Sequence, residues 1–230
     1  MNDTQGNIQD SSRSDWMLER ALQDRDFPLL QSAISAGVDP NLRIGEATAL
    51  TFAVMETKPR FVRYLLQCGA DPNAKNEDGS TALTWAVRDD LVALLVGHGA
   101  TVEAESPESG FTSLHRAAIC GNVDRMGVLL STVSDNRFLD TFDSVGMTPL
   151  VCAVEHGHAD VVKQLLDAGA DPEAVPFDEG GYTALQLALS AGRVGIARRL
   201  VRAGARLDFT RGMGKKPVDI AIAKGILEQL

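Results

Sequence analysis

The sequence is poor in aromatic residues and in cysteine, and each shortage excludes a class of protein. Phe, Trp and Tyr make up 5% of the 230 residues, which is low for a β-sandwich, a β-barrel or a surface on which nucleic-acid bases stack. The three cysteines, Cys68, Cys120 and Cys152, are odd in number and widely spaced, so they form neither a disulfide framework nor a zinc ribbon. No apolar run reaches the roughly 18 residues of a membrane-spanning helix, and the polar N-terminal stretch lacks the apolar core of a signal peptide. We therefore expect a soluble, cytoplasmic protein.

Basic charge is also scarce. The 22 Lys and Arg residues face 31 Asp and Glu residues, which gives a formal charge of −9, and such a chain has no general affinity for nucleic acids or anionic lipids. We predict that neither a nucleic acid nor a membrane is a partner. Residues 183–230 hold nine basic and three acidic residues, a net +6, which leaves −15 for the rest. A solvated end cap explains the basic end most simply; nucleic-acid binding and self-association through it are the alternatives.

Two short patterns recur along the chain. One is a glycine turn, found as GVDPN at 37–41, GADPN at 69–73 and GADPE at 169–173. The other is a Thr-x-Leu start, at Thr48, Thr81, Thr112, Thr148 and Thr183. These threonines are 33, 31, 36 and 35 residues apart, and apolar residues follow each of them at helical spacing. One pair of such helices cannot bury its own apolar face, so the repeats must stack.

These patterns, with a Gly-His turn at 157–158, resemble the ankyrin repeat, a unit of about 33 residues. The resemblance covers about residues 14–230 and implies an all-α fold, a solenoid of stacked helix-turn-helix units with short β-turn fingers. We expect a single ankyrin-repeat domain after a disordered tail at 1–13. Its repeats are expected at about 14–43, 44–75, 76–105, 106–142, 143–177 and 178–210, with a partial capping repeat at 211–230.

The chain lacks the patterns that catalysis or cofactor binding requires. It has no G-x-S-x-G, Walker or dinucleotide-binding motif. His156 and His158 are two residues apart, without a Cys or acidic partner at metal-ligand spacing. His115 and His158 fill repeat positions that predict structural roles, and Cys152 aligns with apolar positions that predict burial. We therefore expect no enzyme, no catalytic residue, no cofactor and no metal.

The resemblance implies that partners bind the concave face, which fingers and first helices form. The residue before each Thr is expected to point outward from its finger; these residues are Ala47, Ser80, Phe111, Met147, Tyr182 and, in the cap, Lys215. Phe111, Met147 and Tyr182 would form an apolar ladder, which is typical of an interface centre. The alternative is that they fold inward and hold each finger to its neighbour. The other candidates are Met55, Glu56, Glu77, Asp78, Arg88, Asp89, Ile119, Glu155 and His156, with Val145 at a finger tip.

We therefore predict a non-catalytic protein–protein interaction module. Its acidic rim would steer a partner that has a basic surface, and we expect the protein itself to be a monomer. A passive adaptor or scaffold is one role that fits. The alternative is a dedicated inhibitor or immunity-type protein that blocks a partner enzyme or toxin. The identity of the partner is not written in the sequence.

Overall fold

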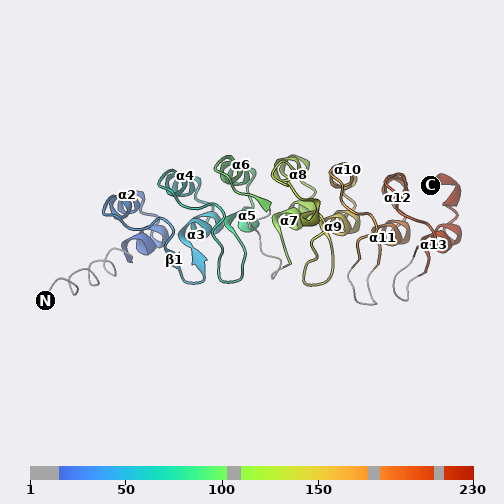
Figure 1. Ribbon diagram of the computed structural model, residues 1–230, viewed down its shortest axis with the longest axis horizontal. Coiled ribbons are helices and arrows are strands. Elements are labelled where there is room, and N and C mark those ends of the chain that lie inside the picture. Colours follow the sequence, from blue (N-terminus) through green and yellow to red (C-terminus); the bar gives the residue numbers. More distant parts are fainter. Residues whose placement is uncertain (1–15, 103–109, 176–181, 210–214) are drawn as a thin grey trace. The chain divides into compact units, whose positions relative to one another are not determined.

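The computed structural model describes residues 16–102, 110–175, 182–209 and 215–230. These residues form pairs of short helices joined by turns (Figure 1). The chain divides into two compact units, residues 1–106 and residues 107–230. The tail predicted at 1–13 lies outside the described residues.

The first unit consists of helix pairs and one small sheet. Its helices are residues 16–23, α2 (Phe27–Ser35), α3 (Ala49–Met55), α4 (Pro59–Gln67), α5 (Ala82–Trp85) and α6 (Asp89–Gly97). Strands β1 (Arg43–Ile44) and β2 (Ala47–Thr48) pair antiparallel, with Ile44 opposite Ala47. The sheet is one of the predicted fingers, so the finger is a hairpin and not only a turn.

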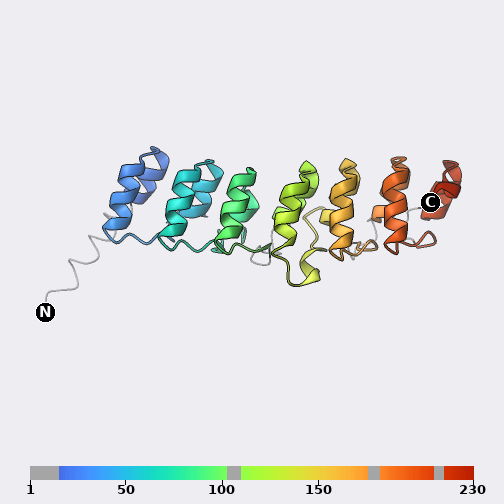
Figure 2. The same ribbon diagram turned by 90° about the horizontal axis from the view of Figure 1, so that it is seen from above.

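The second unit continues the same plan. Its elements are α7 (Ser113–Cys120), α8 (Val123–Leu130), η2 (Asn136–Phe138), α9 (Pro149–His156), α10 (Ala159–Asp167), α11 (Ala184–Ser190), α12 (Val194–Arg202), α13 (Pro217–Ala223) and η3 (Leu227–Gln229). The first helices α7, α9, α11 and α13 pack one against the next, and the second helices α8, α10 and α12 form a parallel layer (Figures 1 and 2). This arrangement confirms the predicted stack of helix pairs.

The recurring threonines start the first helices by capping them. The hydroxyl of Thr48 accepts a hydrogen bond from the backbone N–H of Thr51 at 3.1 Å, and Thr148 does the same for Val151 at 3.3 Å. A cap of this kind satisfies a backbone N–H that has no partner inside the helix. Thr183 adds the reciprocal bond, because its own N–H donates to the side chain of Gln186.

The core consists of aliphatic side chains that recur at the same repeat positions. The leucine of each Thr-x-Leu is at most 2% exposed, and so is the alanine three residues later; these residues are Leu50, Leu83, Leu114, Leu150 and Leu185 with Ala53, Ala86, Ala117, Ala153 and Ala188. The small alanines let neighbouring helices approach closely. Within each unit, neighbouring repeats thus bury their apolar stripes against one another, as the sequence pattern predicts.

One glycine permits a close contact between two repeats. Gly121 ends α7 in the left-handed conformation, with φ of 68°. A Cβ atom at this position would lie 2.4 Å from Nδ1 of His158 in the following repeat. Glycine is therefore needed here both for the backbone angle and for the space.

The third repeat is irregular in its first helix. Helix α5 ends at Trp85 after four residues, and Ala86 is extended with ψ of 103°. The missing second turn leaves Val87 50% exposed.

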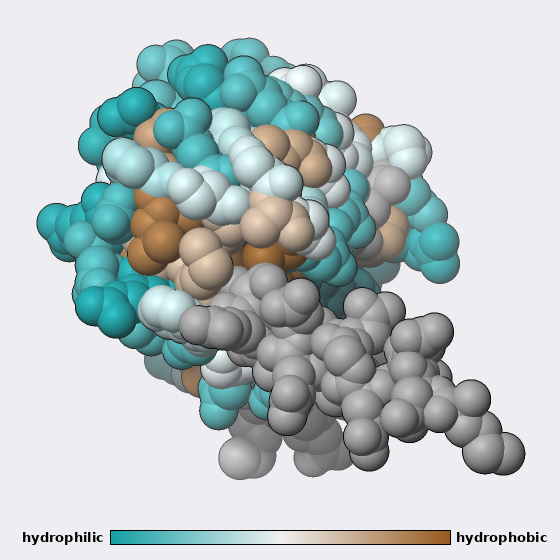
Figure 3. All heavy atoms as spheres, turned by 90° about the vertical axis from the view of Figure 1, so that its left-hand side faces the viewer, coloured by the Kyte–Doolittle hydropathy of each residue, from teal (hydrophilic) through white to brown (hydrophobic). Residues whose placement is uncertain are grey.

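The first repeat also presents some apolar surface at its end, where apolar side chains gather between hydrophilic ones (Figure 3). Trp16 is 45% exposed, and the guanidinium of Arg20 lies 5.7 Å from its ring.

Candidate protein-binding surface

The fingers are short hairpins that their own polar side chains hold in shape. The N–H of Asn76 donates to the carbonyl of Ser80 at 2.8 Å, and Asp143 donates to Met147 at 2.9 Å. The Asp143 carboxylate also accepts from the N–H groups of Val145 and Met147. Bonds from an Asp side chain to the following backbone are typical of tight turns. The finger at 143–147 is therefore fixed before any partner binds.

In the first unit, hydrogen bonds join neighbouring fingers. The side-chain oxygen of Asn76 accepts from the N–H of Thr48 at 3.0 Å. Glu77 donates its N–H to the carbonyl of Glu46, and the Arg43 guanidinium donates to the carbonyl of Lys75 at 2.7 Å. These bonds keep the two fingers in register, so side chains at their tips keep a constant spacing.

In the second unit, His115 joins two repeats. Its Nδ1 accepts from the N–H of Thr112 at 3.2 Å, so the proton lies on Nε2, which donates to the carbonyl of Met147 at 3.0 Å. The ring is fully buried, and this burial lowers the pKa of His115. The neutral imidazole therefore has a structural role, which confirms the prediction.

The three ladder residues differ in exposure. The Phe111 ring stacks on His115 at 5.6 Å between centroids, the Arg116 guanidinium lies 5.5 Å from the Phe111 ring, and Phe111 is half-buried. Met147 is half-buried as well, whereas Tyr182 is 56% exposed. At the tip of the finger between them, Val145 is 75% exposed. The ladder itself stays a prediction.

The expectation of exposure is wrong at the equivalent position of the third repeat. Ser80 is 2% exposed. Its hydroxyl donates to the Asp78 carboxylate at 2.6 Å and accepts from the indole N–H of Trp85 at 2.9 Å. These two hydrogen bonds hold the Ser80 side chain within the finger.

The first-helix candidates of the second unit lie around the ladder residues. Glu155 and His156 are exposed at the end of α9, and Ile119 is half-buried near the end of α7. The Nδ1–H of His156 donates to the carbonyl of Cys152 at 2.9 Å, and its ring stacks on that of His158. These contacts fix the orientation of the His156 ring and leave its other edge on the surface.

Two of the candidates of the first unit, Glu56 and Arg88, are engaged in local ion pairs. The Glu56 carboxylate is 3.5 Å from the Arg25 guanidinium, and Arg88 pairs with Asp90 at 2.8 Å. Met55 is 48% exposed, and Glu77, Asp78 and Asp89 are exposed too. Exposed ion pairs of this kind add little to stability, so these charges act mainly through the field that they present to an approaching partner.

A recurring tie between repeats could not be found from the sequence pattern. Before the second helices α4, α10 and α12, the preceding residue donates to a carbonyl of the previous repeat, although its type changes. The His158 Nε2–H donates to the carbonyl of Ile119 at 3.0 Å, and the Arg193 guanidinium donates to Val154 at 2.7 Å. Lys58 donates in the same way to the carbonyl of Leu22. Lys, His and Arg have the same role at this position, but an alignment of the repeats shows no common residue type there.

A second tie joins successive glycine turns. The side chains of Asn41 and Asn73 accept from backbone N–H groups of the next turn, and Asp140 and Glu173 do so in the second unit. Asn73 also donates to the carbonyl of Gly99 at 2.9 Å, which an ionised carboxylate cannot do. Burial raises the pKa of Asp140 to about 6 and raises that of Glu173 as well.

The described residues form no metal site and place no reactive cysteine at Cys152. Among them, no group of three His, Cys, Asp or Glu side chains is arranged to hold a metal ion. Cys152 is fully buried, as predicted, and its burial raises its pKa to about 12, so its thiol is a poor nucleophile. No helix in the described part of the chain is both long and apolar enough to cross a bilayer.

Comparison with known families decides the identity of the repeats. The family model described as "Ankyrin repeats (3 copies)" matches four overlapping stretches, residues 18–106, 50–137, 88–176 and 129–211. The chain belongs to the ankyrin-repeat family. Ankyrin repeats are in general a non-enzymatic module for protein–protein interaction, so the predicted fold class and the general kind of function are confirmed.

The match covers very different fractions of the length of the curated relatives of this ankyrin-repeat chain. It is 34% identical to rat cyclin-dependent kinase 4 inhibitor B over 129 residues, which are 55% of this chain and 94% of that protein. It is 36% identical to human transient receptor potential cation channel subfamily A member 1 over 99 residues, 42% of this chain and only 9% of that protein. It is 34% identical to Protein PhlB of Serratia liquefaciens over 113 residues, 48% of each chain.

Solved ankyrin structures resemble the chain over most of its length. The ankyrin repeat domain of Bcl-3, described as a unique member of the IkappaB protein family, matches with a TM-score of 0.74 and 26% identity, over 92% of this chain and 96% of that one. The human ASB11 ankyrin repeat domain matches with a TM-score of 0.67 and 25% identity, over 93% and 97%.

Proposed function

We propose that this ankyrin-repeat protein binds a partner protein, without catalysis, through the finger face of its second unit. We define the finger face by Phe111, Val145, Met147 and Tyr182 together with Ile119, Glu155 and His156. The observation that carries the proposal is the exposure of large apolar side chains there: Val145 is 75% exposed and Tyr182 is 56% exposed. Exposed apolar and aromatic residues held on a fixed scaffold are typical anchors of protein interfaces.

The rigidity of the finger supports the same proposal. Association loses less entropy when the contacting side chains are already positioned. The Asp143 carboxylate holds the backbone of the Val145 finger through two hydrogen bonds. His115 fixes the carbonyl of Met147 from the neighbouring repeat, so two anchors are preorganised.

Charge favours a partner with a basic surface. Glu155 is exposed near the end of α9, and in the first unit Glu56 is exposed directly after α3, with Glu77 and Asp78 exposed at a finger tip. Carboxylates at a rim speed the encounter with a basic partner and contribute little to the final affinity. We further propose that the protein is a cytoplasmic monomer that acts as an adaptor.

An inhibitor of a partner enzyme is the second candidate function. One comparison favours it: the matched residues span 94% of rat cyclin-dependent kinase 4 inhibitor B, a protein that consists of little more than the matched region. An inhibitor lowers the activity of its bound enzyme at an equimolar ratio, whereas an adaptor leaves that activity unchanged. Measuring the activity of a captured partner therefore separates the two functions.

The test of binding compares matched variants of the whole chain in affinity capture from the native source. Val145→Ser/Tyr182→Ser removes the two exposed anchors. Ile222→Ser is the control, because Ile222 is 59% exposed on α13 and lies outside the finger face. We expect the partner to be lost with the double variant and kept with the control, while circular dichroism shows that both stay folded. A partner that both variants keep would contradict the proposal.

A further inference from the structure

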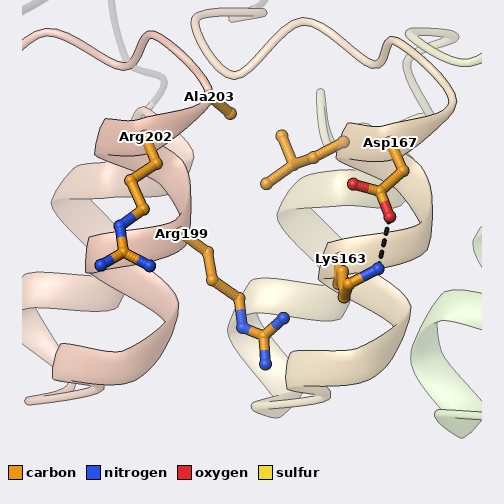
Figure 4. A pocket seen from close by; sticks show the side chains of 6 residues that line it. Lys163, Asp167, Arg199, Arg202 and Ala203 are labelled. Carbon is orange, nitrogen blue, oxygen red and sulfur yellow. Dashed lines mark hydrogen bonds and ion pairs between the residues drawn. The ribbon is translucent and has the colours of Figure 1, made fainter.

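A basic groove lies between two second helices, away from the finger residues. It has a volume of about 330 Å³ and is lined by Lys163, Leu166 and Asp167 of α10, by Arg199 and Arg202 of α12, and by Ala203 directly after α12 (Figure 4). We call it the α10–α12 groove. Helix α12 buries Ile196, Ala197 and Leu200, so its arginines are directed outward by the same amphipathic pattern that builds the core.

The positive charges of this groove exceed the negative ones. Asp167 is the one acidic residue among the six that line it, and it pairs with Lys163 at 2.6 Å. Arg199 extends from α12 toward α10 (Figure 4), but its nearest ion pair, with Asp160, is 4.0 Å long. The guanidinium of Arg202 has no hydrogen bond or ion pair to any described residue. Two guanidinium groups therefore have unused donors at the groove.

The shape of the site and its chemistry favour a carboxylate ligand with an apolar neighbour. A guanidinium group binds a carboxylate through two parallel hydrogen bonds. Leu166 and Ala203 offer apolar surface beside these donors. No aromatic side chain lines the groove, so a base has nothing to stack on. The whole chain carries −9, which disfavours long polyanions such as nucleic acids.

We propose that the α10–α12 groove binds an acidic segment of a partner protein, in which glutamate or aspartate side chains flank an aliphatic one. Arg199 and Arg202 bind the carboxylates, and Leu166 and Ala203 contact the aliphatic group. This surface is separate from the finger face, so the protein can hold a basic surface at its fingers and an acidic segment at its second helices. That property suits an adaptor.

The test measures the binding of a short fluorescein-labelled peptide of glutamate and leucine by fluorescence anisotropy. The same peptide with glutamine in place of glutamate is the ligand control. Arg199→Gln/Arg202→Gln removes the two groove charges, and Lys215→Gln/Lys224→Gln removes two exposed charges of the same unit outside the groove. The two double variants have the same net charge, so they differ only in where charge is lost.

We expect the wild type and the control variant to bind the glutamate peptide equally, and the groove variant to bind it about tenfold more weakly, because two charge-assisted contacts are lost. Equal weakening of both variants would overturn the proposal, and so would a dissociation constant weaker than about 1 mM for the wild type. Tighter binding of duplex DNA or of anionic vesicles through the same arginines would also overturn it. A dimer in sedimentation velocity that disappears in the groove variant would assign the groove to a second copy of the chain instead.

Discussion

Replacing Asp140 with asparagine is expected to stabilise the protein at neutral pH. Asp140 occupies the turn position that Asn41 and Asn73 occupy in the first unit, and its Oδ1 accepts from the N–H of Asp171 at 3.0 Å. Asn73 makes the same acceptor bond and also donates to the carbonyl of Gly99 at 2.9 Å. Asparagine at 140 keeps the acceptor, removes a buried negative charge and gains a donor.

The size of the effect follows from the pKa of Asp140. Burial raises this pKa from 3.8 to about 6, and each unit corresponds to about 1.4 kcal/mol. The ionised form thus lowers the free energy of unfolding by about 3 kcal/mol at most, and we expect about 1–2 kcal/mol because the side chain is only half-buried.

The pH dependence gives a second, independent readout. A carboxyl group whose pKa is raised in the folded state binds a proton more tightly there than in the unfolded chain, so its unfavourable effect is absent below about pH 4 and complete above about pH 7. Urea unfolding of wild type and Asp140→Asn across this range should therefore show an advantage for the variant that grows as the pH rises from 4 to 7. Asp208→Asn, whose side chain is 81% exposed, is the control and should show no such growth. A variant no more stable than wild type at pH 7, or an advantage independent of pH, would refute the reasoning.

Three further substitutions test the packing and the ties between repeats. Leu150→Ala should lower the free energy of unfolding by about 2–5 kcal/mol, as is usual for a fully buried leucine, and an unchanged urea midpoint would show that the core is assigned wrongly. Arg193→Met removes the guanidinium that donates to the carbonyl of Val154, which keeps the N–H of Gly157 as a donor. The loss of this charge-assisted bond should cost about 1–3 kcal/mol in the same assay; no loss would mean that the tie is dispensable. Gly121→Ala should destabilise the protein more than Gly192→Ala, because both have φ near +69° but only the first lacks room for a Cβ. Equal shifts of the two melting temperatures would contradict the role of space at Gly121.

The features that the sequence predicts are those that depend on the same residue type at equivalent positions of the repeats. Thr148 begins a helix because its hydroxyl caps it, and Leu150 is buried because it lies on the apolar stripe. Both facts depend on local chemistry that recurs about every 33 residues. The helices and the direction of their packing could therefore be predicted before any coordinates were known.

The features that the sequence does not predict depend on contacts whose residue types differ from one repeat to the next. Ser80 is buried since Trp85 and Asp78 bond to its hydroxyl, a contact specific to one finger. Lys58, His158 and Arg193 perform one role with three chemistries. The sequence signals the α10–α12 groove only by an excess of arginine in α12, and half of the groove's lining comes from α10 of the neighbouring repeat.

Site-specific photo-crosslinking tests the finger face most directly. Tyr182 is replaced by p-benzoylphenylalanine, which keeps an aromatic side chain at this exposed position, and Ile222 is replaced in the same way in a control protein. Both side chains are more than half exposed, so each probe can reach any protein bound beside it. If the finger face is the binding site, irradiation in an extract of the native source joins the partner to the probe at 182 and not to the probe at 222. A partner joined only at 222, or equally at both positions, would contradict the account.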